Sequence, residues 1–246
     1  MNRRRFLRTS LAAGVGLAGL AVGHGAMDDT LDVRVWFTEA AAGYDGLRER
    51  VEGYLSQAFG RLRDGVRLTF GRPVSVSTEN GYRVTATGEW PAKLATGPPS
   101  PVDDVNLLVT DGQMQTSPTG VGLPHVASVG GARHVARMPP AEDGETVVPF
   151  RNRARITQVL VHEVGHALGL GHDHGTIVDG STHVVVSPMV SAYAWATGNV
   201  RERQFDYRES ACGSTYPSVE GKEGRLDMIY SECALRRIEA VQFDTV

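Results

Sequence analysis

The segment from residue 162 to residue 173 reads HEVGHALGLGHD, and its spacing constrains both the local fold and the local chemistry. Residues four apart on an α-helix differ by about 40° in direction and about 6 Å in rise, so His162 and His166 point the same way. Gly169 lets the helix end, because glycine adopts the left-handed conformation without Cβ strain. The chain can then turn and bring His172 back toward the other two histidines.

Three neutral imidazoles so placed can hold one zinc ion at about 2.1 Å and leave a fourth position open, as in catalytic zinc sites. Glu163 can stand beside the metal without ligating it and take a proton from water. Two other interpretations are histidines that only make hydrogen bonds on a buried helix, and a zinc site that serves stability alone. Glu163 has little purpose in a zinc site that serves stability alone. Apolar residues that back this helix onto a core are Ile156, Val159, Leu160, Val164 and Leu168.

The composition is that of an ordinary globular protein, with 41% hydrophobic and 22% charged residues among 246. A chain of this length can bury one substantial core or two small lobes. The formal net charge is −3, and the first 26 residues hold four arginines and no acid, so the remainder carries −7. This acidic remainder argues against nucleic acid or an anionic membrane as a partner, because both call for a basic face.

Residues 1–26 predict an export signal. Residues 2–8 read NRRRFLR, and an apolar run of 12 follows over residues 11–22, which is too short to span a bilayer comfortably. The pair Arg3-Arg4 followed by Phe6-Leu7 is similar to the twin-arginine signal, which exports folded proteins; an ordinary Sec signal is the alternative. We expect an extracellular or cell-surface protein without a stable membrane span, unless the signal stays uncleaved.

Alternating apolar and polar residues, or short apolar runs, predict strands in the first half of the chain. The expected strands are residues 31–37, 66–77, 82–87, 105–110, 125–129 and 134–138. Asn80-Gly81 favours a hairpin turn between the second and third of them. Residues 91–101 and 112–124 are rich in turn-forming residues and are expected as loops.

Apolar residues that recur every three or four positions predict an amphipathic helix over residues 44–64. The helix that carries the histidines is expected over residues 153–168, with Asn152 as its N-cap. A final helix is expected over residues 229–241, and the chain before it is expected to be mostly irregular. This order of elements predicts an α+β fold with a sheet-bearing N-terminal lobe.

The two cysteines, Cys212 and Cys233, lie 21 positions apart. In an exported protein a disulfide that closes this loop is expected, contributing roughly 3 kcal/mol by loop-entropy reasoning. Two free, buried thiols are the alternative. Neither cysteine falls in a zinc-finger spacing.

The sequence HEVGHALGLGHD resembles the extended zinc motif of the metzincin metalloendopeptidases. Its HALGLGH portion is similar to the matrixin branch, and Asp173 is reminiscent of the adamalysin branch. Metzincins place a methionine-bearing turn beneath the zinc, and Met189, 17 residues after His172, fits that turn within residues 187–191. An ordinary core methionine is the alternative for Met189.

The resemblance implies a metzincin-like zincin: a twisted, mostly parallel sheet with a backing helix and an active-site helix, and a smaller, loop-rich C-terminal lobe that ends in a helix. It implies one metalloprotease catalytic domain over residues 27–246, with lobes of about 27–171 and 172–246. A protein or peptide substrate would lie extended along an edge strand, for which residues 125–129 are the candidate. Zinc-dependent hydrolysis of peptide bonds, with Glu163 as general base, is the implied activity.

Some features depart from the family pattern. The residue two positions after Met189 is Ser191 where some metzincins have a catalytic tyrosine, and Tyr193 lies four positions after it, so its role in catalysis stays open. No cysteine precedes the zinc motif, which excludes a matrixin-like cysteine switch.

Other groups with metal-binding side chains are weaker candidates. His174, Asp179 and His183 follow the third histidine, and a solvated loop is favoured there over a second metal site. Oxygen ligands for calcium, which matrixin-like enzymes often bind, are available at Asp103, Asp104 and Asp111, but their spacing matches no calcium loop. We therefore expect one catalytic zinc ion, with calcium unsupported.

Two other functions remain open: a zinc-binding surface protein that is inactive or of narrow specificity, and a zinc hydrolase of small amides. The intact Glu163 argues against an inactive protein. The sequence does not define the oligomeric state.

Overall fold

The computed structural model describes residues 30–113, 120–141, 145–196, 210–212 and 216–243. The expected signal, residues 1–26, lies outside these ranges. Within them, no helix is both long and apolar enough to cross a membrane.

A five-stranded sheet forms the first half of the molecule, in the order β2-β1-β3-β5-β4. Its strands are β1 (Leu31–Phe37), β2 (Val66–Phe70), β3 (Val105–Val109), β4 (Gly120–Leu123) and β5 (Val126–Val129). β1, β2, β3 and β5 are parallel, and β4 pairs antiparallel to β5 at the edge. The expected parallel-rich sheet is thus confirmed.

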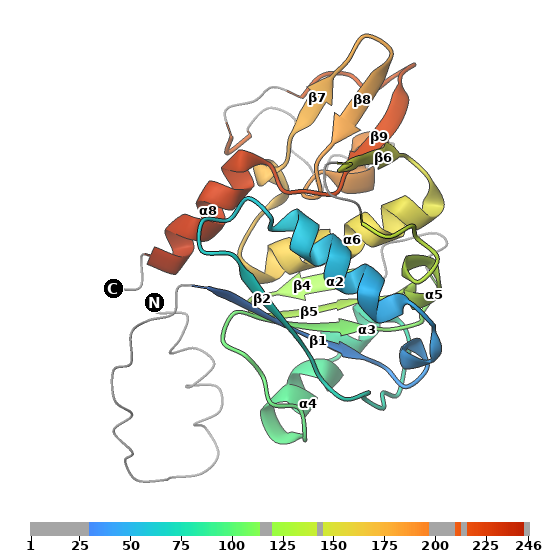
Figure 1. Cartoon of the computed structure of the whole chain (residues 1–246), viewed down its shortest axis with the longest axis vertical. Helices are drawn as coiled ribbons and strands as arrows, with labels where there is room; N and C mark the ends of the chain where they lie inside the picture. Colours follow the sequence, from blue (N-terminus) through green and yellow to red (C-terminus); the bar gives the residue numbers. More distant parts are fainter. Residues whose placement is uncertain (1–29, 114–119, 142–144, 197–209, 213–215, 244–246) are drawn as a thin grey trace.

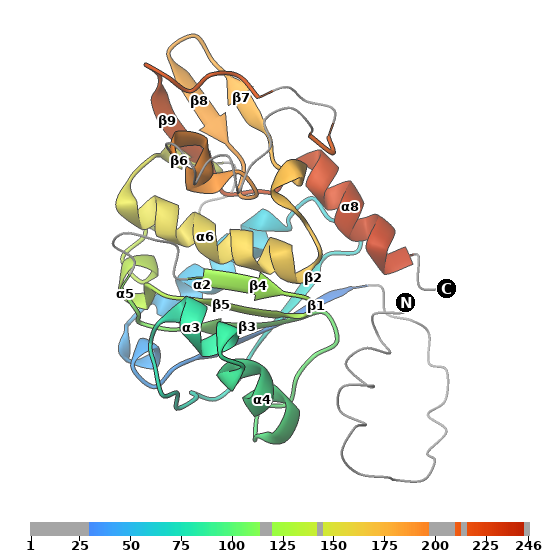
Figure 2. The ribbon, with the colours of Figure 1, turned by 180° about the vertical axis from the view of Figure 1, so that it is seen from behind.

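Helices cover both faces of this sheet (Figures 1 and 2). One face carries α2 (Leu47–Ala58) and α6 (Asn152–Ala167), and the other carries α3 (Gly81–Ala86) and α4 (Glu89–Thr96). β1 contributes side chains to the cores on both faces of the sheet, because successive side chains of a strand point to opposite faces. Its Val33 and Val35 join the core under α2 and α6, whereas Trp36 packs edge-on against Trp90 of α4.

A second sheet, in the order β6-β9-β8-β7, lies on the far side of α6 from the first (Figure 1). Its strands are β6 (Val147–Pro149), β7 (Ile177–Asp179), β8 (His183–Val186) and β9 (Glu223–Asp227). Gln158 of α6 ties the helix to this sheet, since its side-chain amide donates to the carbonyl oxygens of Val186 at 3.0 Å and Asp227 at 2.7 Å. α6 is therefore sandwiched between two sheets.

The remaining helices are short or terminal. α5 (Ala132–Val135) follows β5 and contacts α6. The 3-10 helices are η2 (Ala41–Gly43), η3 (His172–His174) and η4 (Ser191–Trp195). The last helix, α8 (Glu232–Phe243), packs Ala234, Leu235 and Ile238 into the core beside α2 and α6.

The structure corrects several expectations for the first half of the chain. Asn80-Gly81 does not form a hairpin: the Asn80 side chain accepts from the backbone N–H of Arg83 at 2.9 Å and caps α3. Asparagine suits a helix N-cap as well as a turn, so the sequence alone was ambiguous. α4 occupies part of the expected loop 91–101, because Pro91 sits in the first turn, where no helical hydrogen bond from its nitrogen is needed. Residues 134–138 are the end of α5 and the turn that follows it, rather than a strand.

Two further corrections concern the surroundings of α6. The edge strand that packs against α6 is β4, within the expected loop 112–124, so the expected edge 125–129 is wrong and its strand is interior. The expected loop-rich C-terminal lobe, residues 172–246, contains three strands, and β6 from before α6 joins their sheet; all four are too short for a clear periodic pattern. The N-cap of α6 is Arg151, with Asn152 as the first helical residue, and α2 and α8 begin three residues later than expected.

Candidate metal centre

α6 positions the first two candidate ligands in the interior of the molecule. His162 and Glu163 are 3% and 4% exposed, because one side of the helix packs on the first sheet and the other on the second. His162 and His166 lie four residues apart on this helix, and their ring centroids are 4.5 Å apart. The expected helical pairing of the two histidines is therefore present.

The helix ends at a glycine, and this ending returns the third histidine to the site. Gly169 has φ of 84°, in the left-handed region, and the Leu170 N–H donates to the Gly165 carbonyl oxygen at 3.0 Å. Such a hydrogen bond across a left-handed glycine reverses the chain direction. η3 then carries His172 to the other two rings.

The three Nε2 atoms converge. His166 Nε2 lies 2.9 Å from His162 Nε2 and 3.1 Å from His172 Nε2. The Nδ1 atoms of His162 and His166 face the carbonyl oxygens of Pro188 at 2.7 Å and Leu170 at 2.9 Å, so each Nδ1 donates and each Nε2 keeps a lone pair. Lone pairs that face one another repel, and a cation between them removes the repulsion.

This donor set fits zinc. Zn–N bonds of about 2.05 Å in tetrahedral geometry separate the nitrogens by about 3.3 Å, so an ion would move these rings apart by only a few tenths of an ångström. Burial and the neighbouring histidines hold the pKa of His162 well below its usual value and lower that of His166 to about 4. Both imidazoles are therefore neutral at pH 7, which is the form that binds metals. Among the described residues, these three histidines are the group that could hold a metal ion.

The side chain of Glu163, a residue of α6, lies against the edge strand β4. Burial raises its pKa to about 8, and a hydrogen bond from the Gly122 backbone N–H opposes that rise. A cation on the adjacent histidines would lower the pKa, because an opposite charge favours the carboxylate. A Cβ at Gly120 would lie 2.7 Å from Glu163 Oε1, so the glycines of β4 let the strand approach this carboxylate closely.

Met189 lies directly against α6, beneath the ligands. It is 1% exposed, and a Cβ at Gly165 would come within 2.5 Å of its Sδ. The turn that carries it is closed by hydrogen bonds from the N–H groups of Val190 and Ser191 to the Ser187 carbonyl oxygen, at 3.1 and 3.0 Å. Met189 is thus packed on α6 within a closed turn, and its role as a methionine turn beneath a zinc ion stays a prediction.

Tyr193 also reaches the site, and Ser191 lies two residues before it in the same 3-10 helix. The Tyr193 ring centroid lies 4.8 Å from that of His172, and burial together with the Glu163 charge raises the tyrosine pKa to about 12. Ser191 is 3% exposed and has φ of 48°, an uncommon conformation for a residue with a side chain. The sequence pointed to Tyr193 only by its position four residues after Met189.

The other candidate groups do not assemble into a second metal site within the described ranges. Asp179 pairs with Lys222, and His183 lies on β8 rather than in a loop. Asp104 accepts the backbone N–H of Asp32 at 2.8 Å. Asp111 pairs with Arg133. Cys212 and Cys233 are joined by a disulfide.

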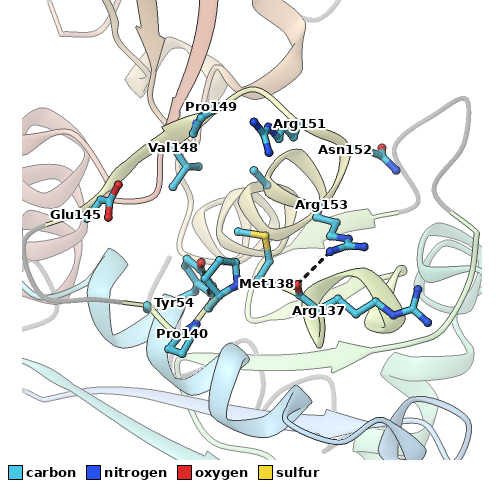
Figure 3. A pocket seen from close by; sticks show the side chains of 13 residues that line it. Tyr54, Arg137, Met138, Pro140, Glu145, Val148, Pro149, Arg151, Asn152 and Arg153 are labelled. Carbon is cyan, nitrogen blue, oxygen red and sulfur yellow. Dashed lines mark hydrogen bonds between the residues drawn. The ribbon is translucent and has the colours of Figure 1, made fainter.

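A cavity of about 640 Å³ lies elsewhere, at the beginning of α6 (Figure 3). Its lining includes Tyr54, Met138, Val148 and Arg153, and the Arg153 guanidinium donates to the Arg137 carbonyl oxygen at 3.4 Å. Arg153 and His162 are nine positions apart on the helix, which is about 13 Å at 1.5 Å per residue. This cavity is therefore separate from the histidines.

Residues outside the motif complete the centre, and sequence reasoning missed them. The carbonyl groups of Pro188 and Leu170 orient the rings, and Gly120 and Gly122 bring β4 against Glu163. Backbone carbonyls leave no sequence signal. The Gly-Val-Gly spacing of β4 was a signal that one face of this strand is closely packed.

No protein family matches the chain, and no curated protein is similar to it. Among solved structures, it is similar to archaemetzincin from Methanopyrus kandleri, with 14% sequence identity and a TM-score of 0.46. That similarity covers 89% of this chain and 98% of the other. The functional interpretation therefore rests on the geometry of the histidines and not on similarity to known proteins.

Proposed function

We propose that this chain is an exported zinc-dependent endopeptidase whose zinc ion is held by His162, His166 and His172. The convergence of three Nε2 atoms beside the buried carboxyl group of Glu163 carries the proposal. When bound, zinc supplies Lewis acidity, which makes a nearby water molecule more acidic and polarises a peptide carbonyl group. Three histidines leave a coordination position for that chemistry.

Glu163 serves as the general base in this proposal. Its carboxylate accepts the proton of the attacking water and then donates that proton to the leaving amine nitrogen. The Gly122 N–H, which hydrogen-bonds this carboxyl group, orients it, and burial keeps bulk water away. A structural metal site would need no such carboxyl group.

The substrate in this proposal is a peptide segment in extended conformation along β4. Among the described strands, β4 pairs on one side only, with β5, and its glycines lie against Glu163 and His166. An extended peptide can pair with such a strand edge through backbone hydrogen bonds. This arrangement replaces residues 125–129 with β4 as the substrate edge.

Export is a further part of the proposal. It rests on the twin-arginine-like sequence in residues 1–26 and is consistent with a disulfide between Cys212 and Cys233, since disulfides persist in oxidising compartments. Comparing the N-terminal sequence of protein recovered from medium with that of cell-associated protein would test it. Recovery of the intact, unprocessed chain only from the cytoplasm would contradict export.

The decisive experiment measures casein hydrolysis by the zinc-loaded protein, with and without a zinc chelator. We expect one zinc per chain and activity that the chelator abolishes. Glu163→Ala should keep the zinc and lose at least about 100-fold in activity, the usual contribution of a general base. Glu52→Ala, which removes an exposed carboxylate of α2, is the matched control and should stay fully active.

Other outcomes of this experiment would support other functions. One zinc per chain without casein hydrolysis, but with cleavage of short amides, would identify a zinc hydrolase of small amides. One zinc and no hydrolysis of either substrate would identify a zinc-binding surface protein or an enzyme of narrow specificity. No zinc binding would remove the basis of the proposal.

A further inference from the structure

Of the three candidate ligands, His172 lies on the shortest element of secondary structure. His162 and His166 belong to a sixteen-residue helix between two sheets, whereas His172 begins a three-residue 3-10 helix. Two glycines, Gly169 and Gly171, precede it and give the free chain more conformations than other residues would. The position of His172 therefore depends on contacts made by the residues around it.

The backbone directly after His172 receives hydrogen bonds from a distant part of the chain. The Asp173 carbonyl oxygen accepts from the Ala211 N–H at 3.1 Å and from the Ser210 hydroxyl at 3.2 Å. The Gly175 carbonyl oxygen accepts from the Tyr216 hydroxyl at 3.1 Å. Residues 210–212 and Tyr216 thus hold the loop on one side.

Ser231, directly before α8, holds His174, which lies between Asp173 and Gly175. The His174 carbonyl oxygen accepts from the Ser231 hydroxyl at 3.1 Å, and Cys212 Sγ lies 3.5 Å from the same oxygen. The Ser231 hydroxyl also accepts from the Ala234 N–H at 3.2 Å, which fixes it at the first turn of α8. The three carbonyl groups that follow His172 are therefore all engaged.

The Cys212–Cys233 disulfide joins these two sets of contacts. Cys233 belongs to α8, which is anchored in the main core through Ala234 and Leu235. Cys212 belongs to the segment that binds the Asp173 carbonyl group. The disulfide is thus a covalent cross-link between α8, which is anchored in the core, and the segment that holds the loop after His172.

We infer that the Cys212–Cys233 disulfide is a positioning element for the zinc ligand His172, so that tight zinc retention requires the oxidised protein. The inference rests on the proposed zinc site. Reduction by a trialkylphosphine breaks the S–S bond: the phosphine supplies two electrons, water supplies the oxygen of the phosphine oxide, and each sulfur becomes a thiol. Residues 210–212 are then free to leave Asp173, and His172 loses its fixed position. The metal held in the oxidised protein is released more readily from the reduced one.

The test measures the zinc dissociation constant by competition with a chromophoric chelator, before and after treatment of the folded protein with the phosphine. Loss of groups that orient a metal ligand costs about 10- to 100-fold in affinity, and we expect a rise in the dissociation constant within that range. The Cys212→Ser/Cys233→Ser variant should show the same rise without reductant. Its dissociation constant should not respond to the phosphine, which controls for binding of zinc by the reductant.

A second comparison separates positioning from general stabilisation. Asp111→Asn removes an ion pair between the segment after β3 and Arg133 of α5, far from the disulfide in sequence, and should lower the unfolding midpoint without changing zinc affinity. Tyr216→Phe keeps the disulfide, removes the hydrogen bond to Gly175, and should weaken zinc binding less than reduction does. Unchanged zinc affinity after reduction, or equal weakening in Asp111→Asn, would overturn the inference. If the oxidised wild-type protein binds no zinc, it is the proposed function that fails.

Discussion

The Nδ1 atom of His162 donates a hydrogen bond of 2.7 Å to the carbonyl oxygen of Pro188, the residue directly before Met189. This contact connects α6 to the methionine turn and determines which nitrogen of the ring is available to a metal. His166 has the same arrangement, with its Nδ1 2.9 Å from the Leu170 carbonyl oxygen. Hydrogen bonds of this kind fix the tautomer and the orientation of a ligating imidazole.

We predict that His162 and His166 carry their protons on Nδ1 in the zinc-loaded protein and bind through Nε2. The reason is that a carbonyl oxygen can only accept, so the facing nitrogen must donate. Nitrogen-15 correlation spectra of the imidazole rings should show two Nδ1–H signals that exchange slowly with water. Zinc coordination through Nδ1 of either ring would contradict this geometry.

His166→Ala should weaken zinc binding by more than about 100-fold, because loss of a ligand should cost more than the 10- to 100-fold lost with an orienting partner. His183→Ala is the matched control: His183 lies on β8 and is outside the three-histidine group. Equilibrium dialysis against a zinc buffer measures both. A comparable loss in the His183 variant would point to a ligand set different from the one proposed.

The arrangement of His162, His166 and His172 could be predicted because it follows from local geometry. Helical spacing aligns the first two rings, and the glycine ending returns the third within six residues. β1 was predicted with its observed bounds because alternation over seven residues is a strong signal. In each case the information lies within a short stretch of chain.

The surroundings of α6 could not be predicted in the same way, since they depend on contacts distant in sequence. β7 has three residues and β8 has four, and such strands are stabilised by their neighbours rather than by a pattern of their own. The contact between His162 and Pro188 spans 26 residues and uses a backbone carbonyl group. The glycines of β4 become informative only when Glu163 is seen against them.

Gly122→Ala should destabilise the protein, because a Cβ there would lie 2.4 Å from the Glu163 carbonyl oxygen and 2.5 Å from His166 Cβ. β4 would have to move away from α6, and forcing extra atoms into a packed interior typically costs about 1–3 kcal/mol. Urea unfolding of the metal-free protein measures the loss. Gly43→Ala has nothing within 4 Å of the added Cβ and should leave stability near that of the wild type. Equal stability of the two variants would mean that β4 is not packed on α6 as described.

The last prediction concerns the pH dependence of stability and rests on Asp111, two residues after the end of β3. Burial alone would raise the pKa of its carboxyl group, but hydrogen bonds from Arg133 and Tyr44 outweigh it and hold the pKa below the usual value of 3.8. A carboxyl group whose pKa is lower in the folded than in the unfolded protein stabilises the fold above the unfolded value. Its contribution is lost as the pH falls through the folded value.

Asp111→Asn should therefore unfold at lower urea concentration than the wild type at pH 5 to 7, and the difference should shrink as the pH falls below 3.8. Metal-free protein is used so that zinc release at low pH does not contribute. Asp103→Asn removes an exposed carboxylate that precedes β3 and should show little difference from the wild type at any of these pH values. A difference for Asp111→Asn that stays unchanged down to the lowest pH at which the protein remains folded would mean that the carboxylate charge is not what stabilises this contact.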